Sequence, residues 1–282
     1  MIRIILSLLV FVFLFEPNQL KAQGNLQTMI ETGISLANGL TEYQTELLHA
    51  EFDVLKTSDN TRSSYRALFA GQGYGISALG GERIKDLDII VYKPSGDDWI
   101  EVARDKSTSP EAIVFVFPET SDLYRIDVIA YKFDARYLYE YYGLFVASGA
   151  GNNSQSMSEF MSSSLSSIRT IESQLDYQLI RAEFDIVNKS SLTTKSMLRE
   201  LIGGVNYYAF AVGGSLIEDI DLYLYKSTKN GWSLQQKNNS TGSAAVVQVS
   251  PMSNNLYRFD VEAYSLKTGY TADVYGLFLF LK

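Results

Sequence analysis

The sequence contains no cysteine and only one histidine, His49. Without cysteine there can be no disulfide, thiolate-bound zinc, iron–sulfur cluster or thiol nucleophile, and no acylated cysteine to anchor a lipoprotein. A single histidine excludes a multi-histidine metal site and leaves one candidate base for a Ser–His–Asp triad. We expect His49 to be a polar residue at the end of a helix instead.

Positive charge is also scarce. The 282 residues include 24 Lys+Arg against 32 Asp+Glu, a net charge of −8, and no basic run. This balance argues against a nucleic-acid partner. The hydrophobic share of 46% and charged share of 20% are typical of a folded globular chain. The aromatic share of 13% favours β structure, and the length allows one large or two modest domains.

The first 22 residues have the pattern of a secretory signal peptide. Arg3 precedes the apolar run Ile4–Phe15, and a small residue, Ala22, stands at the expected cleavage site. The run is shorter than the roughly 20 residues that a membrane-spanning helix needs. We therefore expect cleavage, a mature chain of residues 23–282 with no transmembrane anchor, and a periplasmic or extracellular location. The alternatives are an uncleaved anchor or a buried core helix.

The rest of the chain is an internal duplication. Residues 71–146 align without gaps to residues 204–279, and 29 of the 76 aligned positions are identical. Among them are Gly80-Gly81 with Gly213-Gly214, Asp86 and Asp88 with Asp219 and Asp221, and Trp99 with Trp232. A period this long indicates two globular units rather than a solenoid.

Each copy begins with a helical pattern and continues with strands. Apolar residues spaced by three and four run from Leu26 to Leu48 and from Met157 to Leu179, and predict two amphipathic helices. Alternation over residues 86–92 and 124–131, with turn signals between, predicts short antiparallel strands. The predicted fold is mainly β, with two tandem antiparallel β-sandwich domains of jelly-roll type, each preceded by a helix. The predicted boundaries are 1–22 for the signal peptide, 23–147 for the first domain, 148–158 for the linker and 159–282 for the second domain.

The order of signals within each copy resembles the bacterial pre-peptidase C-terminal domain family. The segments that carry the resemblance are Tyr74 with Ala78 and Gly80, Asp86-Leu87-Asp88-Ile89-Ile90-Val91-Tyr92, Ile113–Phe117 before Pro118, and Leu123-Tyr124-Arg125-Ile126-Asp127-Val128. The resemblance implies a secreted β-sandwich appended to an exoenzyme, some relatives of which bind collagen or calcium. The sequence departs from the family because no catalytic domain accompanies the repeats. It also has Lys93 and Lys226 where the family often has aspartate.

The repeated aspartates are the candidate metal ligands. They are Asp86, Asp88 and Asp127 in the first copy and Asp219, Asp221 and Asp260 in the second. Clustered carboxylates suit calcium, which takes six to eight oxygen ligands. In the alternative interpretation these acids form a charge ladder on a polar strand face with Arg125 and Arg258. A third interpretation is acid/base catalysis by a carboxylate pair flanking a cleft.

Aromatic and glycine-rich segments have structural interpretations. The tyrosines of residues 137–142 suggest sugar stacking, but the apolar residues at the equivalent positions of the second copy favour core packing. Trp99 and Trp232 allow either packing in the sandwich or an exposed contact, and their repetition favours packing. Residues 71–75 look like a phosphate loop but lack its Lys-Ser/Thr ending, so we expect a turn. The two helices are expected to pack on their own sandwich or on each other rather than bind a membrane.

These features predict an exported, non-catalytic binding or scaffold protein whose partner is an unidentified protein or glycan, with no cofactor. The alternative is a calcium-dependent adhesion protein, or one that binds matrix or glycan. A carboxylate-based hydrolase is a remote third interpretation.

Overall fold

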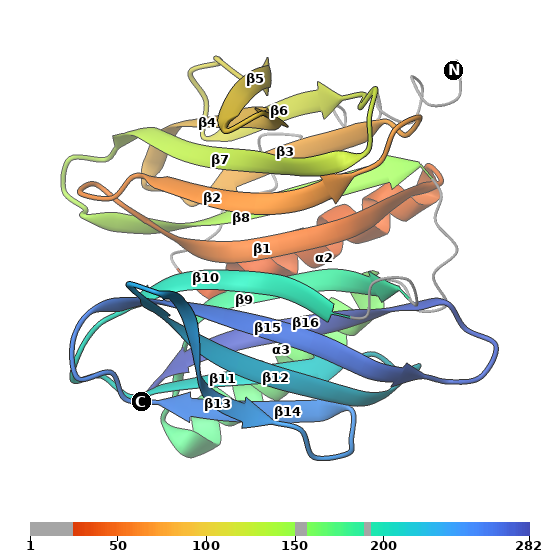
Figure 1. The fold of residues 1–282 in the computed structure, drawn as a ribbon. Helices are drawn as coiled ribbons and strands as arrows, with labels where there is room; N and C mark the ends of the chain where they lie inside the picture. Colours follow the sequence, from red (N-terminus) through yellow and green to blue (C-terminus); the bar gives the residue numbers. More distant parts are fainter. Residues whose placement is uncertain (1–24, 150–156, 189–192) are drawn as a thin grey trace. The chain divides into compact units, whose positions relative to one another are not determined.

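The computed structural model describes residues 25–149, 157–188 and 193–282. The chain divides into two compact units, residues 1–152 and 153–282, and the described part of each consists mainly of antiparallel strands (Figure 1). The predicted signal peptide, residues 1–22, lies outside the described residues. Strand β8 extends to Gly149 and helix α3 begins at Met157, so both elements overlap the predicted linker, residues 148–158. Residues 150–156 lie outside the described residues.

Unit 1 has one helix and eight strands among its described residues. They are α2 (Leu26–Glu42), β1 (Thr45–Lys56), β2 (Thr61–Leu68), β3 (Tyr74–Gly80), β4 (Ile84–Ser95), β5 (Asp98–Arg104), β6 (Glu111–Val116), β7 (Asp122–Phe133) and β8 (Tyr139–Gly149). The pairings give the order β1-β8-β3-β6 in one layer and β2-β7-β4-β5 in the other. Except at the β4–β5 hairpin, each successive strand joins the opposite layer or returns from it. This is the strand order of a jelly roll.

Unit 2 repeats this arrangement. Its described elements are α3 (Met157–Leu175), β9 (Gln178–Asn188), β10 (Thr193–Leu201), β11 (Tyr207–Gly213), β12 (Ile217–Thr228), β13 (Gly231–Asn238), β14 (Ala244–Val249), β15 (Asn255–Leu266) and β16 (Ala272–Leu281). The layers have the orders β9-β16-β11-β14 and β10-β15-β12-β13. The predicted fold class, mainly β with antiparallel sandwiches and a preceding helix, is confirmed.

The core of unit 1 lies between its two layers. As the alternation predicts, Leu87, Ile89 and Val91 of β4 point inward, together with alternate residues of β7 from Tyr124 to Ala130. Strand β8 departs from alternation and is buried almost continuously. Its second face is covered, because α2 contacts both β8 and β1. Strands covered on both faces have continuous apolar sequences, which explains the run from Tyr142 to Ala147.

The helices end earlier than predicted. Helix α2 ends at Glu42 and α3 at Leu175, so Leu47, Leu48 and Leu179 belong to strands. The residues after the helices, Gln44 and Asp176, occupy equivalent positions and both have left-handed backbone, with φ of 57° and 54°. The prediction was wrong at this point because a strand buried on both faces extends the apolar pattern of the helix without a break.

A buried carboxylate explains one repeated glycine in each unit. In unit 1, Glu140 accepts hydrogen bonds from the backbone N–H groups of Tyr141, at 2.9 Å, and Arg83, at 3.3 Å. A Cβ atom on Gly81 would lie 2.7 Å from the Glu140 carboxyl carbon. In unit 2, Asp273 takes the same place beneath Gly214. The repeated glycines therefore leave room for the carboxylate that holds the turn before β4 or β12.

Candidate functional site

The outer face of the β2-β7-β4-β5 layer carries an arginine between two aromatic rings. Arg125 on β7 is paired in register with Tyr92 on β4. Its guanidinium carbon lies 4.2 Å from the centre of the Tyr92 ring and 5.3 Å from that of Trp99 on β5. Tyr65 on β2 extends the group, with its ring centre 5.8 Å from that of Trp99. The outer face thus holds a stack that continues across its four strands.

Unit 2 builds the same stack from the equivalent residues. The guanidinium carbon of Arg258 lies 4.7 Å from the ring centre of Tyr225 and 5.0 Å from that of Trp232. Leu198 stands in the register position next to Arg258, where unit 1 has Tyr65. Cation–π contacts of this kind fix an arginine against the rings.

An aspartate orients each arginine. Arg125 Nε lies 3.2 Å from Asp127 Oδ1, which also accepts a hydrogen bond of 2.7 Å from the Ser63 hydroxyl. Arg258 Nη2 donates to Asp260 Oδ2 at 2.9 Å. Two of the six predicted metal ligands, Asp127 and Asp260, are therefore ion-paired to arginines, as the charge-ladder interpretation expects.

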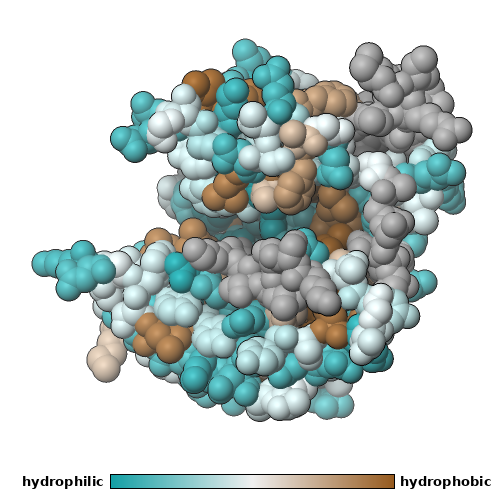
Figure 2. All heavy atoms as spheres, turned by 45° about the vertical axis from the view of Figure 1, so that its right-hand side comes forward, coloured by the Kyte–Doolittle hydropathy of each residue, from teal (hydrophilic) through white to brown (hydrophobic). Residues whose placement is uncertain are grey.

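Exposed apolar side chains surround both stacks. Unit 1 exposes Tyr65, Leu123 and Tyr131, and unit 2 exposes the equivalent Leu198, Leu256 and Tyr264. On the face that Figure 2 shows, hydrophobic residues form small separate groups among hydrophilic ones. We call the stack with its exposed apolar neighbours the aromatic–arginine face of each unit.

The tryptophans correct the prediction that they pack inside the sandwich. Trp99 is partly exposed, Trp232 is 38% exposed, and both lie on the outer face against arginine. The tyrosine segment is also corrected in part, because Tyr139 is about half exposed whereas Tyr142 fills the core. His49 is not at a helix end: it is buried in β1, with Nε2 2.9 Å from Arg66 Nη2. The expected turn at residues 71–75 is present, with Gly71 at a φ of 80° before β3.

The other four candidate aspartates lie near further acids. Burial raises the pKa of Asp88, and the charges of Asp86 and Asp105 raise it further. Burial likewise raises the pKa of Asp221, while a hydrogen bond of 3.2 Å from the Tyr223 hydroxyl lowers it. Each of these residues thus lies near the aspartate two positions before it, but Asp88 also lies near Asp105, and Asp221 near Glu262.

No three of the six candidate aspartates, all of which are described, bring carboxylate oxygens within 4.8 Å of one another. The Asp86–Asp88 pair could supply some of the oxygens that calcium requires, and the Asp219–Asp221 pair could do the same. The remainder would have to come from backbone carbonyls or water. Calcium binding stays a prediction.

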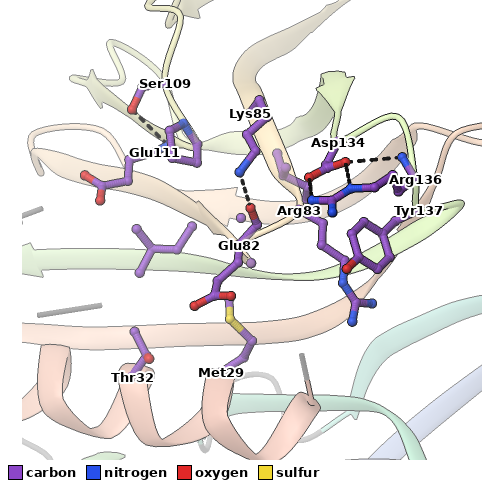
Figure 3. Close-up of a pocket in the computed structure, with 15 residues that line it drawn as sticks. Met29, Thr32, Glu82, Arg83, Lys85, Ser109, Glu111, Asp134, Arg136 and Tyr137 are labelled. Carbon is purple, nitrogen blue, oxygen red and sulfur yellow. Dashed lines mark hydrogen bonds and ion pairs between the residues drawn. The ribbon is translucent and has the colours of Figure 1, made fainter. Parts of the chain in front are cut away.

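Unit 1 also has a pocket of about 710 Å³ beside α2. Met29 and Thr32 of α2 lie along one side, and the turn before β4 lies opposite (Figure 3). Ser109–Glu111 and residues 134–137 complete the lining. The volume lies within the range of about 300–1,000 Å³ typical of small-molecule sites.

Charges of both signs line this pocket. The Arg83 guanidinium carbon lies 4.1 Å from the Tyr137 ring centre, and Arg136 forms two hydrogen bonds with Asp134, at 3.1 and 2.9 Å. Arg136 holds the pKa of the Asp134 carboxyl at about 2. Burial raises the pKa of Glu111. Sequence reasoning missed the pocket because these residues are separated along the chain and form no motif.

No protein-family model and no curated protein matches this sequence. Among solved structures, the chain is similar to the PBSX exported protein XepA, at 12% identity over 83% of this chain and 86% of that one, with a TM-score of 0.28. It is also similar to the pre-peptidase C-terminal domain of a collagenase from Bacillus anthracis, at 17% identity over 35% of this chain and 89% of that one, with a TM-score of 0.27. A third similar structure is the g-type lysozyme inhibitor PliG of Aeromonas hydrophila, at 17% identity over 36% and 87%, with a TM-score of 0.28.

These TM-scores are too low to support a conclusion about the fold or function of this chain. The jelly-roll assignment rests on the strand order. Membership of the pre-peptidase C-terminal domain family stays a prediction. Neither α2 nor α3, the helices of the described residues, is both long and apolar enough to cross a membrane.

Proposed function

We propose that this chain is an exported, non-catalytic binding protein that contacts a protein partner through the aromatic–arginine face of each unit. The observation that carries the proposal is the repetition of this face. Along β5 and its counterpart in β13, residues 98–104 and 231–237, only the tryptophan is the same in both copies. The other positions of this edge strand therefore differ between the two copies, whereas the tryptophan that stacks on the arginine is retained.

The composition of the face favours a protein partner. Tryptophan, tyrosine and arginine are the residues that most often dominate the binding energy of protein interfaces. The surrounding Leu123 and Leu256 are 49% and 41% exposed and would supply apolar area. Because Asp127 and Asp260 hold their arginines in place, little side-chain freedom would be lost on binding.

The surroundings of the candidate catalytic groups support the non-catalytic part of the proposal. Asp127 and Asp260 are engaged by arginines, and the one histidine is buried against Arg66. The export part rests on the sequence of residues 1–22. The calcium-dependent alternative rests on the Asp86–Asp88 pair and its repetition as Asp219–Asp221, which could supply some of the oxygens that calcium requires.

Site-specific photocrosslinking in the producing cells tests the proposal. A photoreactive residue replaces Leu123 or Leu256, and Leu138, which is 75% exposed and lies outside the face, serves as the control position. We expect a discrete protein adduct from Leu123 that Trp99→Ala removes and Trp232→Ala leaves, and the converse from Leu256. Adducts equal to those from Leu138, or adducts indifferent to both substitutions, would overturn the proposal. Retention on a polysaccharide without any protein adduct would replace the protein partner by a glycan.

A further inference from the structure

The pocket beside α2 is lined by three acidic and three basic side chains, which are Glu82, Glu111 and Asp134 with Arg83, Lys85 and Arg136. Figure 3 shows Glu111 at one end and Asp134, Arg136 and Tyr137 at the other, with Glu82, Lys85 and Arg83 between them. Met29 contributes an apolar surface from α2. A ligand that spans this pocket would meet the Glu111 carboxylate at one end and, at the other, the Arg136 guanidinium, which is hydrogen-bonded to Asp134.

The acidic and basic side chains of the pocket differ in whether they already have an ion-pair partner. Among the described residues, neither Glu82 nor Glu111 has an ion-pair partner, and Glu111 is half-buried. Arg83 Nε lies 3.6 Å from Glu140, and the rest of its guanidinium covers the Tyr137 ring. An ammonium group on the ligand would therefore lower the cost of holding the Glu111 carboxylate away from water.

The charged lining exists in one copy only. At the positions equivalent to Arg83, Glu111 and Arg136, unit 2 has Leu216, Ala244 and Gly269. The framework is nevertheless repeated, since the turn glycines and the buried carboxylate behind them occur in both units. The charges of Arg83, Glu111 and Arg136 are thus not required to build this turn. Their presence in unit 1 alone is consistent with a ligand site in that unit.

We propose that the unit 1 pocket binds a small zwitterion with an apolar body, namely a free amino acid or a short peptide. Its ammonium group would face Glu82 and Glu111, its carboxylate would face Arg83 and Arg136, and its side chain would contact Met29. This site is separate from the aromatic–arginine face and does not depend on the function proposed for that face.

Isothermal titration calorimetry of the full chain with L-alanyl-L-leucine and with L-leucine tests the proposal. The matched ligands are N-acetyl-L-alanyl-L-leucine, which lacks the ammonium group, and L-alanyl-L-leucinamide, which lacks the carboxylate. We expect L-alanyl-L-leucine, L-leucine or both to bind. If the dipeptide binds, each of its two blocked forms should bind at least tenfold more weakly than the dipeptide. Absence of binding by both free compounds at millimolar concentration, or equal binding of a blocked form, would overturn the proposal.

The second copy supplies variants that the fold already accepts. Glu111→Ala and Arg83→Leu each introduce the residue that unit 2 has at the same position, and Glu119→Met does so outside the pocket. The first two should weaken binding at least tenfold, while the third should change neither binding nor the melting temperature. Glu111→Ala should leave the melting temperature unchanged, whereas Arg83→Leu also removes the ion-pair partner of the buried Glu140 carboxylate and should lower it. Unchanged affinity in both pocket variants would contradict the assignment, even if a zwitterion binds elsewhere on the chain.

Discussion

Glycine is required at positions 81 and 214 because of the side chain beneath each, Glu140 or Asp273, rather than because of backbone conformation. Neither is among the glycines with positive φ, but a Cβ atom on either would meet the buried carboxylate at 2.7 Å. That carboxylate accepts backbone hydrogen bonds from the turn, so it cannot move away without leaving buried N–H groups unpaired. Repetition of a glycine pair in the sequence indicates a turn but does not identify this cause.

Gly81→Ala should therefore destabilise the chain. We expect a loss of about 1–3 kcal/mol in the free energy of unfolding, the usual cost of forcing extra atoms into a packed site. Urea unfolding followed by circular dichroism measures the change. Gly149→Ala is the matched control, because a Cβ atom there meets nothing within 4 Å. Equal stability of the two variants would show that the carboxylate is not fixed beneath the turn.

At the scale of elements, the sequence predicts most of the sheet faces correctly. Alternation placed Leu87, Ile89 and Val91 inward, and they are buried in the sandwich core. It failed where both faces of a strand are covered, because Leu47 and Leu48 then continue the apolar pattern of α2. The aromatic–arginine face could be predicted only in pieces, since Arg125, Tyr92 and Trp99 meet through strand register that the sequence does not specify.

The left-handed residue after α2 offers a test of the helix boundary. Gln44 adopts a φ of 57°, a conformation that costs a non-glycine residue roughly 1–2 kcal/mol. Gln44→Gly should relieve part of this cost and raise the free energy of unfolding by up to about 1 kcal/mol, measured by urea unfolding. Glu42→Gly, two residues earlier and still within α2, should lower stability instead. Loss of stability in both variants would indicate that the helix continues past Glu42.

For the whole molecule, the aspartates predict how stability depends on pH. The pKa values of Asp88 and Asp221 are raised above 3.8 in the folded state. Their contribution to stability is therefore full below pH 3.8 and is lost as the pH rises through the folded-state values. In EDTA at pH 7, the double variant Asp88→Asn/Asp221→Asn should melt at a higher temperature than the unmodified chain, and the difference should disappear near pH 3.

The same melts in millimolar calcium distinguish the two interpretations of the aspartates. If they form a surface charge ladder, calcium leaves both melting curves unchanged. If they bind calcium, the unmodified chain gains about 2.7 kcal/mol at 100 times the dissociation constant, and the double variant gains nothing. The second result would favour the calcium-dependent adhesion alternative.

The two tryptophans of the chain, one in each aromatic–arginine face, report directly on the surface to which the proposed function is assigned. Acrylamide quenching of their fluorescence, in the unmodified chain and in Trp99→Phe and Trp232→Phe, is the most direct test of that assignment. We predict that the remaining tryptophan of each variant is readily quenched in the folded protein. Emission that stays shielded until the chain unfolds would place the tryptophans in the core and contradict the account.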